Sequence, residues 1–214
     1  MPTQALIFDL DGTLLDTLED LTCATNHVLE HLGQPAIPQS TCRQMIGNGA
    51  RVLLKRAVGG DQRAMEDALD RFLAYYDEHK YDHTTPFAGI PKTLDALAER
   101  GRRFAVLSNK PHPATTQMVA HLLSDWDFEV VFGQREGMPL KPDPTAALDI
   151  CQRMEVQPGD VTFVGDSGED MAVAKAAGMF AVGVTWGLRD EPELREHGAD
   201  VIIHSPHQLL EVLR

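Results

Sequence analysis

Short apolar runs alternate along most of the chain with segments of helical spacing. Most of these runs are continuous, which is typical of parallel strands buried on both faces. The predicted strands are Ala5–Asp9, Phe104–Ser108, Glu129–Phe132, Val161–Gly165, Ala181–Val184 and Val201–Ile203. The predicted helices between and after them are Pro91–Arg100, Ala114–Leu123, Pro144–Met154, Asp170–Ala177 and Gln208–Leu213. This alternation predicts an α/β fold with a doubly wound, Rossmann-like parallel sheet.

One long stretch, from about residue 18 to residue 81, breaks the alternation because it shows no convincing strand. Apolar residues recur there at helical spacing, on a stripe that begins at Leu18, again around Leu53, and again over residues 65–76. We therefore predict a helical cap subdomain of residues 17–83, inserted into an α/β core of residues 1–16 and 84–214. The expected hinges are residues 14–17 and 84–89.

Composition and charge narrow the class of protein. The 214 residues are 43% hydrophobic and 24% charged, as in ordinary globular proteins. A formal net charge of −13 without a basic stripe argues against nucleic-acid binding. The chain contains no membrane-length apolar run and no signal-peptide pattern at its start, so we predict a cytoplasmic protein without a membrane partner. The three cysteines are expected to be reduced and to have packing roles.

Polar residues follow the predicted strands at the ends where an open parallel sheet binds its ligands. They are Asp9 and Asp11 after the first strand, Ser108 and Asn109 at the end of the second, Lys141 after the third, and Asp166 and Asp170 after the fourth. Acids at the end of a buried strand destabilise the fold unless they find partners. We therefore expect these residues to converge at one edge of the sheet.

The converging residue types suit a metal and a phosphate. Asp9, Asp166 and the backbone carbonyl of Asp11 offer the oxygen ligands that Mg²⁺ prefers. Lys141 would offset the acids and attract phosphate. The Ser108 hydroxyl and the backbone N–H groups of Asn109 and Asp11 can bind phosphate oxygens.

Four motifs in this order resemble the haloacid dehalogenase superfamily. They are DxDGT from Asp9, Ser108 followed by Asn-Lys-Pro, Lys-Pro-Asp-Pro from Lys141, and GDSxxD from Gly165. The resemblance implies that Asp9 is a nucleophile forming an aspartyl-phosphate. It further implies that Asp11 is the general acid and base, that Ser108 binds phosphate, and that Lys141 stabilises the developing charge. Asp166 is then a metal ligand, with Asp170 supporting the site from behind.

A short cap segment, IGNGARVLLKRA over residues 46–57, most resembles phosphoglycolate phosphatases within that superfamily. The resemblance implies a small phosphorylated metabolite, 2-phosphoglycolate, as substrate. Positions 52, 53, 56 and 57 share one helical face, and Arg56 is the one charged residue among them. We therefore expect Arg56, with Asn48 and Gly49 at the helix N-terminus, to bind the substrate carboxylate. A structural ion pair of Arg56 with a cap acid is the alternative.

Other interpretations stay open. Asp11 favours a phosphoester over a halide, because a halide leaving group needs no general acid. Another small phosphate could be the substrate, the enzyme could be a phosphomutase, or the chain could bind phosphate without turnover. Lys110 could contact substrate or be solvated. The spaced pairs His27/His31 and His79/His83 are expected to be solvated positions rather than metal ligands. The sequence does not indicate the oligomeric state.

Overall fold

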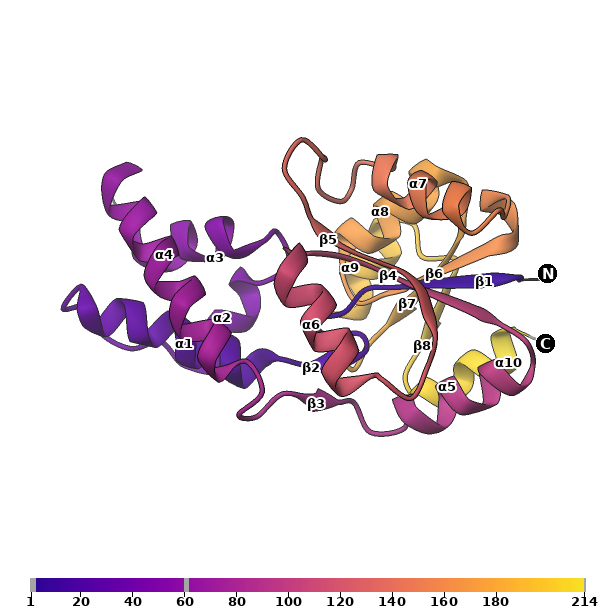
Figure 1. Cartoon of the computed structure of the whole chain (residues 1–214), viewed down its shortest axis with the longest axis horizontal. Helices are drawn as coiled ribbons and strands as arrows, with labels where there is room; N and C mark the ends of the chain where they lie inside the picture. The colour runs from indigo at the N-terminus through magenta and orange to yellow at the C-terminus, as the bar shows by residue number, and fades with distance from the viewer. Residues whose placement is uncertain (1–2, 60–61, 214) are drawn as a thin grey trace.

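A computed structural model describes residues 3–59 and 62–213. Its centre is a six-stranded parallel sheet with the strand order β5-β4-β1-β6-β7-β8 (Figure 1). The strands are β1 (Ala5–Phe8), β4 (Arg103–Pro111), β5 (Phe128–Gln134), β6 (Val161–Gly165), β7 (Phe180–Val184) and β8 (Val201–Ile203). The first strand is central, between β4 and β6, with Leu6 paired to both Phe104 and Thr162. The predicted doubly wound parallel sheet is confirmed.

Each face of the sheet packs against its own layer of helices (Figure 1). Leu6 and Phe8 of β1 face a cluster with α5 (Ile90–Glu99), α6 (His112–Leu122) and α10 (Leu209–Val212). Ala5 and Ile7 face a cluster with α7 (Thr145–Arg153), α8 (Gly168–Ala177) and α9 (Glu191–Glu196). All four residues of β1 are buried, which explains why the strand is a continuous apolar run.

The inserted segment folds as the helices α1 (Leu18–His31), α2 (Gln39–Met45), α3 (Ala50–Val58) and α4 (Gln62–His79), at one end of the molecule (Figure 1). Their apolar side chains join the same connected cluster as one face of the sheet. The division into a core of residues 1–16 and 84–214 and a cap of 17–83 stays a prediction. Residues 1, 2, 60, 61 and 214, which those ranges include, lie outside the described residues.

The two crossings between cap and core are tied together. At the expected hinges, β2 (Leu15–Asp16) pairs antiparallel with β3 (Thr85–Pro86), a contact that sequence analysis did not predict. The buried carboxylate of Asp20 accepts hydrogen bonds from the backbone N–H groups of His83 and Thr84 and, at 2.6 Å, from the Thr84 hydroxyl. Cap and core therefore meet at a braced junction.

Three details differ from the sequence predictions. Strand β4, predicted as Phe104–Ser108, continues past Ser108 to Pro111, with a register shift between Leu107 and Pro111, so the polar motif residues lie within it. Helix α9 was not predicted, because Leu194 is its one buried residue and gives no helical stripe. Cys42 and Cys151 are buried, as expected, but Cys23 is exposed, so a packing role for it is wrong.

Candidate active site

The first acidic motif turns sharply at the end of β1. Asp9 follows the strand, and Gly12 adopts a positive φ of +90°. A Cβ atom on Gly12 would lie 2.3 Å from a carboxylate oxygen of Asp166, so only glycine lets the two motifs approach this closely. The glycine of the DxDGT motif is therefore required by the close contact between the ends of β1 and β6.

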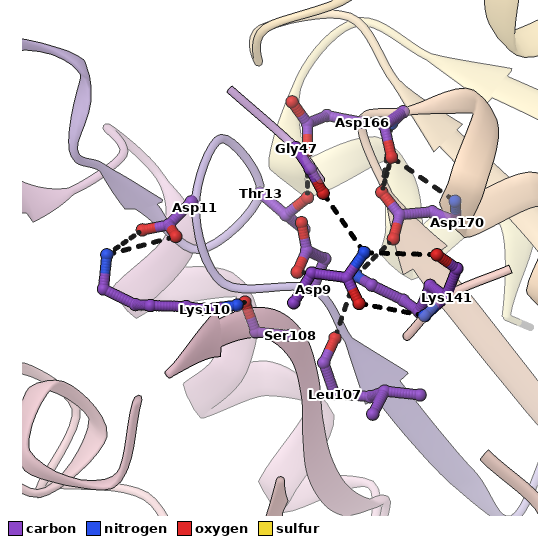
Figure 2. A network of polar contacts seen from close by, with 12 residues as sticks. Asp9, Asp11, Thr13, Gly47, Leu107, Ser108, Lys110, Lys141, Asp166 and Asp170 are labelled. Carbon is purple, nitrogen blue, oxygen red and sulfur yellow. Dashed lines mark hydrogen bonds and ion pairs between the residues drawn. The ribbon is translucent and has the colours of Figure 1, made fainter. Parts of the chain in front are cut away.

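Lys141 holds two acids together at this edge of the sheet. Its Nζ lies 2.8 Å from Asp9 Oδ1 and 2.6 Å from Asp170 Oδ1, and it donates to the Leu107 carbonyl at 3.0 Å (Figure 2). Burial alone would lower the pKa of Lys141, but the charges of Asp170 and Asp9 outweigh it and raise that pKa. The ammonium is therefore charged while it neutralises the acids.

Asp166 completes a group of three buried acids. Oxygens of Asp9, Asp166 and Asp170 all lie within 4.8 Å of one another. Asp166 accepts hydrogen bonds from the Thr13 hydroxyl at 3.1 Å and from the backbone N–H of Leu188 at 2.6 Å. Even so, burial and the charge of Asp170 raise the pKa of Asp166 to about 7, and burial raises that of Asp9 well above its usual value. The single positive charge of Lys141 does not balance the charge of three carboxylates. The carboxylate oxygens suit a hard divalent cation.

Asp170 supports this cluster from the start of α8. Its Oδ2 accepts hydrogen bonds from the backbone N–H of Ser167 at 3.0 Å and from the Ser167 hydroxyl at 2.6 Å, in a capping box. Because its other oxygen contacts Lys141, the carboxylate is fully engaged within the protein. This arrangement suits its predicted supporting role. The Asp11 carbonyl as a further metal ligand stays a prediction.

The side chain of Asp11 faces a different partner. Its two carboxylate oxygens lie 3.1 and 3.2 Å from Lys110 Nζ, away from the three acids (Figure 2). Lys110 is buried and also donates to the hydroxyl of Tyr76, on cap helix α4, at 2.8 Å. Burial alone would lower the pKa of Lys110, but the charge of Asp11 raises it overall. The solvated alternative for Lys110 is therefore wrong.

Ser108 and Asn109 lie between these two clusters. The Ser108 side chain is buried and its oxygen accepts the backbone N–H of Lys110 at 3.2 Å. The Asn109 amide accepts the backbone N–H of Lys141 at 2.9 Å and donates to the carbonyl of Gly47 in the cap at 3.2 Å. Its side chain thus fixes the Lys141 loop and the cap, which leaves its backbone N–H as the group predicted to meet phosphate.

A cavity lies between the acids and the cap. Core residues Asp9, Asp11, Ser108, Asn109 and Lys110 line one side of it, and Leu21, Ile46, Leu53, Phe72 and Tyr76 belong to its cap side. Gly49 also lines it, with a φ of +83°, and a Cβ there would lie 3.2 Å from the Asn109 carbonyl oxygen. The predicted position of Gly49 near the site therefore agrees with the structure.

Arg56 does not lie at the cavity, where a contact with the substrate carboxylate was expected. Leu53 and Leu54 are the buried residues of α3, and Arg56 is exposed. Its guanidinium donates to the Met45 carbonyl at 2.9 Å and to the Asn48 side chain at 2.8 Å. Asn48 in turn donates to Glu169 of α8 at 2.5 Å. Neither Arg56 nor Asn48 is among the described residues that line the cavity, so both act in holding the cap loop to the core.

Comparison with known proteins assigns the family. The family model for haloacid dehalogenase-like hydrolases matches residues 6–184. This chain belongs to that family. A phosphoglycolate phosphatase of Nitrosospira multiformis is 34% identical over 223 residues, covering all of this chain and 97% of that protein. Phosphoglycolate phosphatase 1 of Pseudomonas aeruginosa is 34% identical, covering 96% of this chain and 78% of that protein.

A solved structure agrees over the whole fold. The crystal structure of a predicted phosphoglycolate phosphatase from Haemophilus somnus 129PT superposes with a TM-score of 0.93 at 27% identity, covering 100% of this chain and 99% of that one. The predicted superfamily is thus confirmed. In the described part of this hydrolase, no helix combines the length and apolar character that a bilayer crossing needs. The cytoplasmic location stays a prediction.

Sequence analysis missed a pair of arginines that join cap and core in this hydrolase. Arg43 of α2 donates to the carbonyls of Gly187 and, at 2.8 Å, Leu188. Arg189 donates back to the carbonyl of Arg43 at 2.8 Å. Because Leu188 also donates to Asp166, the cap contacts the loop that orients a predicted metal ligand. Isolated arginines outside any motif gave no signal for this contact.

The two histidine pairs lie mostly at solvent-exposed positions. His27, His31 and His83 are exposed, and His79 contacts Asp82 at 2.8 Å. Among the residues that the structure describes, Asp9, Asp166 and Asp170 form the one group of three or more acids, histidines or cysteines placed to share a cation.

Proposed function

We propose that this haloacid dehalogenase-like hydrolase is a Mg²⁺-dependent phosphatase that hydrolyses 2-phosphoglycolate through an aspartyl-phosphate. The observation that carries the proposal is the separation of two acids of one motif. Asp9 lies against Lys141 beside two further carboxylates, whereas Asp11 lies apart on Lys110. A nucleophile next to a metal site and a separate proton carrier are what phosphoester hydrolysis needs. The relatives named phosphoglycolate phosphatases support the substrate.

In the first step, an oxygen of Asp9 attacks the phosphorus in line, and the bond to the ester oxygen breaks. Asp11 gives its proton to the departing alcohol oxygen. In the second step, Asp11 takes a proton from water, whose oxygen attacks the phosphorus and releases phosphate from Asp9. Lys141 offsets charge on Asp9 throughout, and Ser108 and the backbone N–H of Asn109 hold the phosphoryl oxygens.

The candidate ligands are all oxygens, which supports a hard divalent cation, and we propose Mg²⁺. Asp9 and Asp166 would hold it together with the Asp11 carbonyl. When bound, it supplies positive charge to the phosphoryl oxygens and fixes the direction of attack.

A panel of small phosphate compounds tests the substrate. The purified protein with Mg²⁺ should hydrolyse 2-phosphoglycolate with a kcat/KM at least about tenfold above sugar phosphates, nucleotides and pyrophosphate, a difference of about 1.4 kcal/mol in transition-state binding. An equal or greater rate on another member would assign a different phosphatase. Return of phosphate to the substrate rather than to water would indicate a phosphomutase. No turnover of any member would leave a phosphate-binding protein.

Asp9→Asn tests the mechanism with the same substrates. The amide is a poor nucleophile, so turnover should fall at least about a thousandfold while the fold is kept.

EDTA should abolish wild-type turnover, and Mg²⁺ or Mn²⁺ should restore it. Ca²⁺ should inhibit, since its looser coordination misplaces Asp9. Wild-type rates in Asp9→Asn, or full activity after EDTA treatment, would contradict this mechanism.

A further inference from the structure

The cavity under the cap contrasts a polar floor with an apolar roof. The side chains of Leu21, Leu53 and Phe72 come from the cap and are buried. Hydroxyl groups of a sugar or a nucleotide would lose their hydrogen bonds with water against such a wall, which disfavours those leaving groups. Any charge on the leaving group must therefore meet a cation from the floor.

Lys110 is the one cationic side chain among the described residues that line this cavity. Its side chain is 4% exposed, so its position is fixed by its partners. The core provides the Asp11 carboxylate, and the cap provides the Tyr76 hydroxyl at 2.8 Å. Tyr76 is oriented in turn by Met118, whose sulfur lies 3.7 Å from its oxygen. The ammonium is therefore presented at the cavity by both parts of the molecule.

The distance between Lys110 and Asp11 defines which substrate charge Lys110 can reach. A general acid lies about 2.6–3.2 Å from the oxygen that it protonates. Lys110 Nζ lies 3.1 Å from Asp11, so it is next to the first atoms of the leaving group. In a phosphorylated 2-hydroxy acid, the carboxylate is on the carbon that bears the ester oxygen. That carboxylate falls within reach of Lys110, whereas Arg56 is engaged outside the cavity.

We propose that Lys110, held by Tyr76 of the cap, binds the substrate carboxylate and selects O-phosphorylated 2-hydroxycarboxylates. This inference rests on the proposed phosphatase function and names the residue that would give it its specificity. Tyr76 acts as a positioning residue, because it reaches the substrate only through the lysine. The ammonium has three N–H groups, so it can serve the carboxylate of the substrate together with Asp11 and Tyr76.

A pair of matched substrates separates this role from any effect on Asp11. 2-Phosphoglycolate and 2-hydroxyethyl phosphate are similar in size and differ in having a carboxylate or a neutral CH₂OH group. The ratio of their kcat/KM values cancels changes in the shared chemistry. Lys110→Met should lower this ratio about 10- to 100-fold, the loss of one charge-assisted contact. Lys110→Arg should restore part of it, and Tyr76→Phe should lower it less than Lys110→Met does.

The exposed Lys55 of cap helix α3 offers the matched control. Lys55→Met also removes one lysine charge, but from the cap surface, and should leave the ratio of the two kcat/KM values unchanged. A ratio within about threefold of wild type in Lys110→Met, with both rates lowered equally, would overturn the inference and leave Lys110 as a partner of Asp11 alone. Lack of wild-type turnover of 2-phosphoglycolate would instead refute the proposed function, so the two failures are distinct.

Direct binding covers the case in which Lys110→Met is inactive. In an Asp9→Asn background, calorimetry should show that Lys110→Met lowers the affinity for 2-phosphoglycolate at least about tenfold. The affinity for 2-hydroxyethyl phosphate should change little. Circular dichroism verifies that the double variant is folded. Equal weakening of both ligands would again contradict a carboxylate site, and so would unchanged binding of both.

Discussion

Two aspartates one residue apart have opposite surroundings in this hydrolase. Asp9 is buried beside Lys141 and two other carboxylates, and burial raises its pKa well above the usual value. Asp11 faces Lys110 across the floor of the cavity. Residues two apart in an extended strand point to the same side, so the separation arises because the chain leaves β1 after Phe8 and turns at Gly12. The pair therefore separates nucleophile from proton carrier at the level of single side chains.

This separation predicts different losses for two isosteric substitutions. Asp11→Asn should lower kcat at least about 100-fold, the contribution of a general acid, while Mg²⁺ affinity measured by calorimetry stays near wild type. Asp166→Asn should lower the Mg²⁺ affinity at least about tenfold, since even residues that only support a metal ligand contribute that much to metal affinity. Loss of Mg²⁺ affinity in Asp11→Asn but not in Asp166→Asn would reverse the two assignments.

Element by element, prediction succeeded where the pattern was long and failed where it was short. The buried strands and the motifs at their ends placed Asp9, Lys141 and Asp166 together, because parallel strands bring their carboxyl ends to one edge. Helix α3 has nine residues with Leu53 and Leu54 as its buried residues, so its phase was ambiguous and Arg56 was assigned to the wrong face. Strands β2 and β3 have two residues each, too few for any period.

Contacts between elements could not be predicted from the sequence, for a different reason. Lys110 lies in a recognised motif, but its burial depends on Tyr76, 34 residues away on a cap helix. The reciprocal bonds of Arg43 and Arg189 end on backbone carbonyls, which carry no residue signature. Such contacts depend on how the cap sits on the core, and no local pattern encodes that placement.

The N-terminus of α3 provides a test of this placement. Gly49→Ala forces a side chain onto a φ of +83° and brings its Cβ to 3.2 Å from the Asn109 carbonyl oxygen of the core. We expect kcat/KM to fall roughly tenfold, because sub-ångström displacement of a closing element is costly to catalysis. Gly33→Ala is the matched control: φ is +67° and nothing lies within 4 Å of the added atom. It should lower the melting temperature while keeping activity, and equal activity in both variants would exclude a role for this cap contact.

At the scale of the whole molecule, cap and sheet share one apolar cluster, and the acidic centre belongs to the core. The cluster runs from the cap helices to one face of the sheet, and the acids lie at its edge where the strands end. With a formal net charge of −13, the molecule does not attract an anionic substrate by its overall field. Lys110 in the cavity, together with Lys141 and a bound cation beside Asp9, must therefore supply the attraction locally.

The buried acidic centre should make stability depend on pH and on metal together. The pKa of Asp166 is about 7 in the folded chain against an ordinary value of 3.8, because of burial and the charge of Asp170. The folded state therefore holds a proton between about pH 4 and pH 7 that the unfolded state has lost. By linkage, this group makes the metal-free protein less stable as pH rises through that window. Mg²⁺ competes with the proton, so its stabilisation should grow over the same range.

Thermal unfolding at about pH 5.5 and about pH 8, with EDTA or with millimolar Mg²⁺, measures both effects. Without metal, the melting temperature should fall by at least about 4 °C between the two pH values, since 1 kcal/mol shifts it by about 2–4 °C in a domain of this size. Mg²⁺ should raise it more at the higher pH. Asp166→Asn serves as the comparison, because it removes the titrating carboxyl and also one of the charges that raise the pKa of Asp9. Its pH dependence should be smaller, and Mg²⁺ should have little effect. The contrary result is a Mg²⁺-induced rise in melting temperature that is the same at both pH values in the unmodified chain. It would show that Mg²⁺ displaces no proton from a carboxyl, so that the acids are already charged before the metal binds.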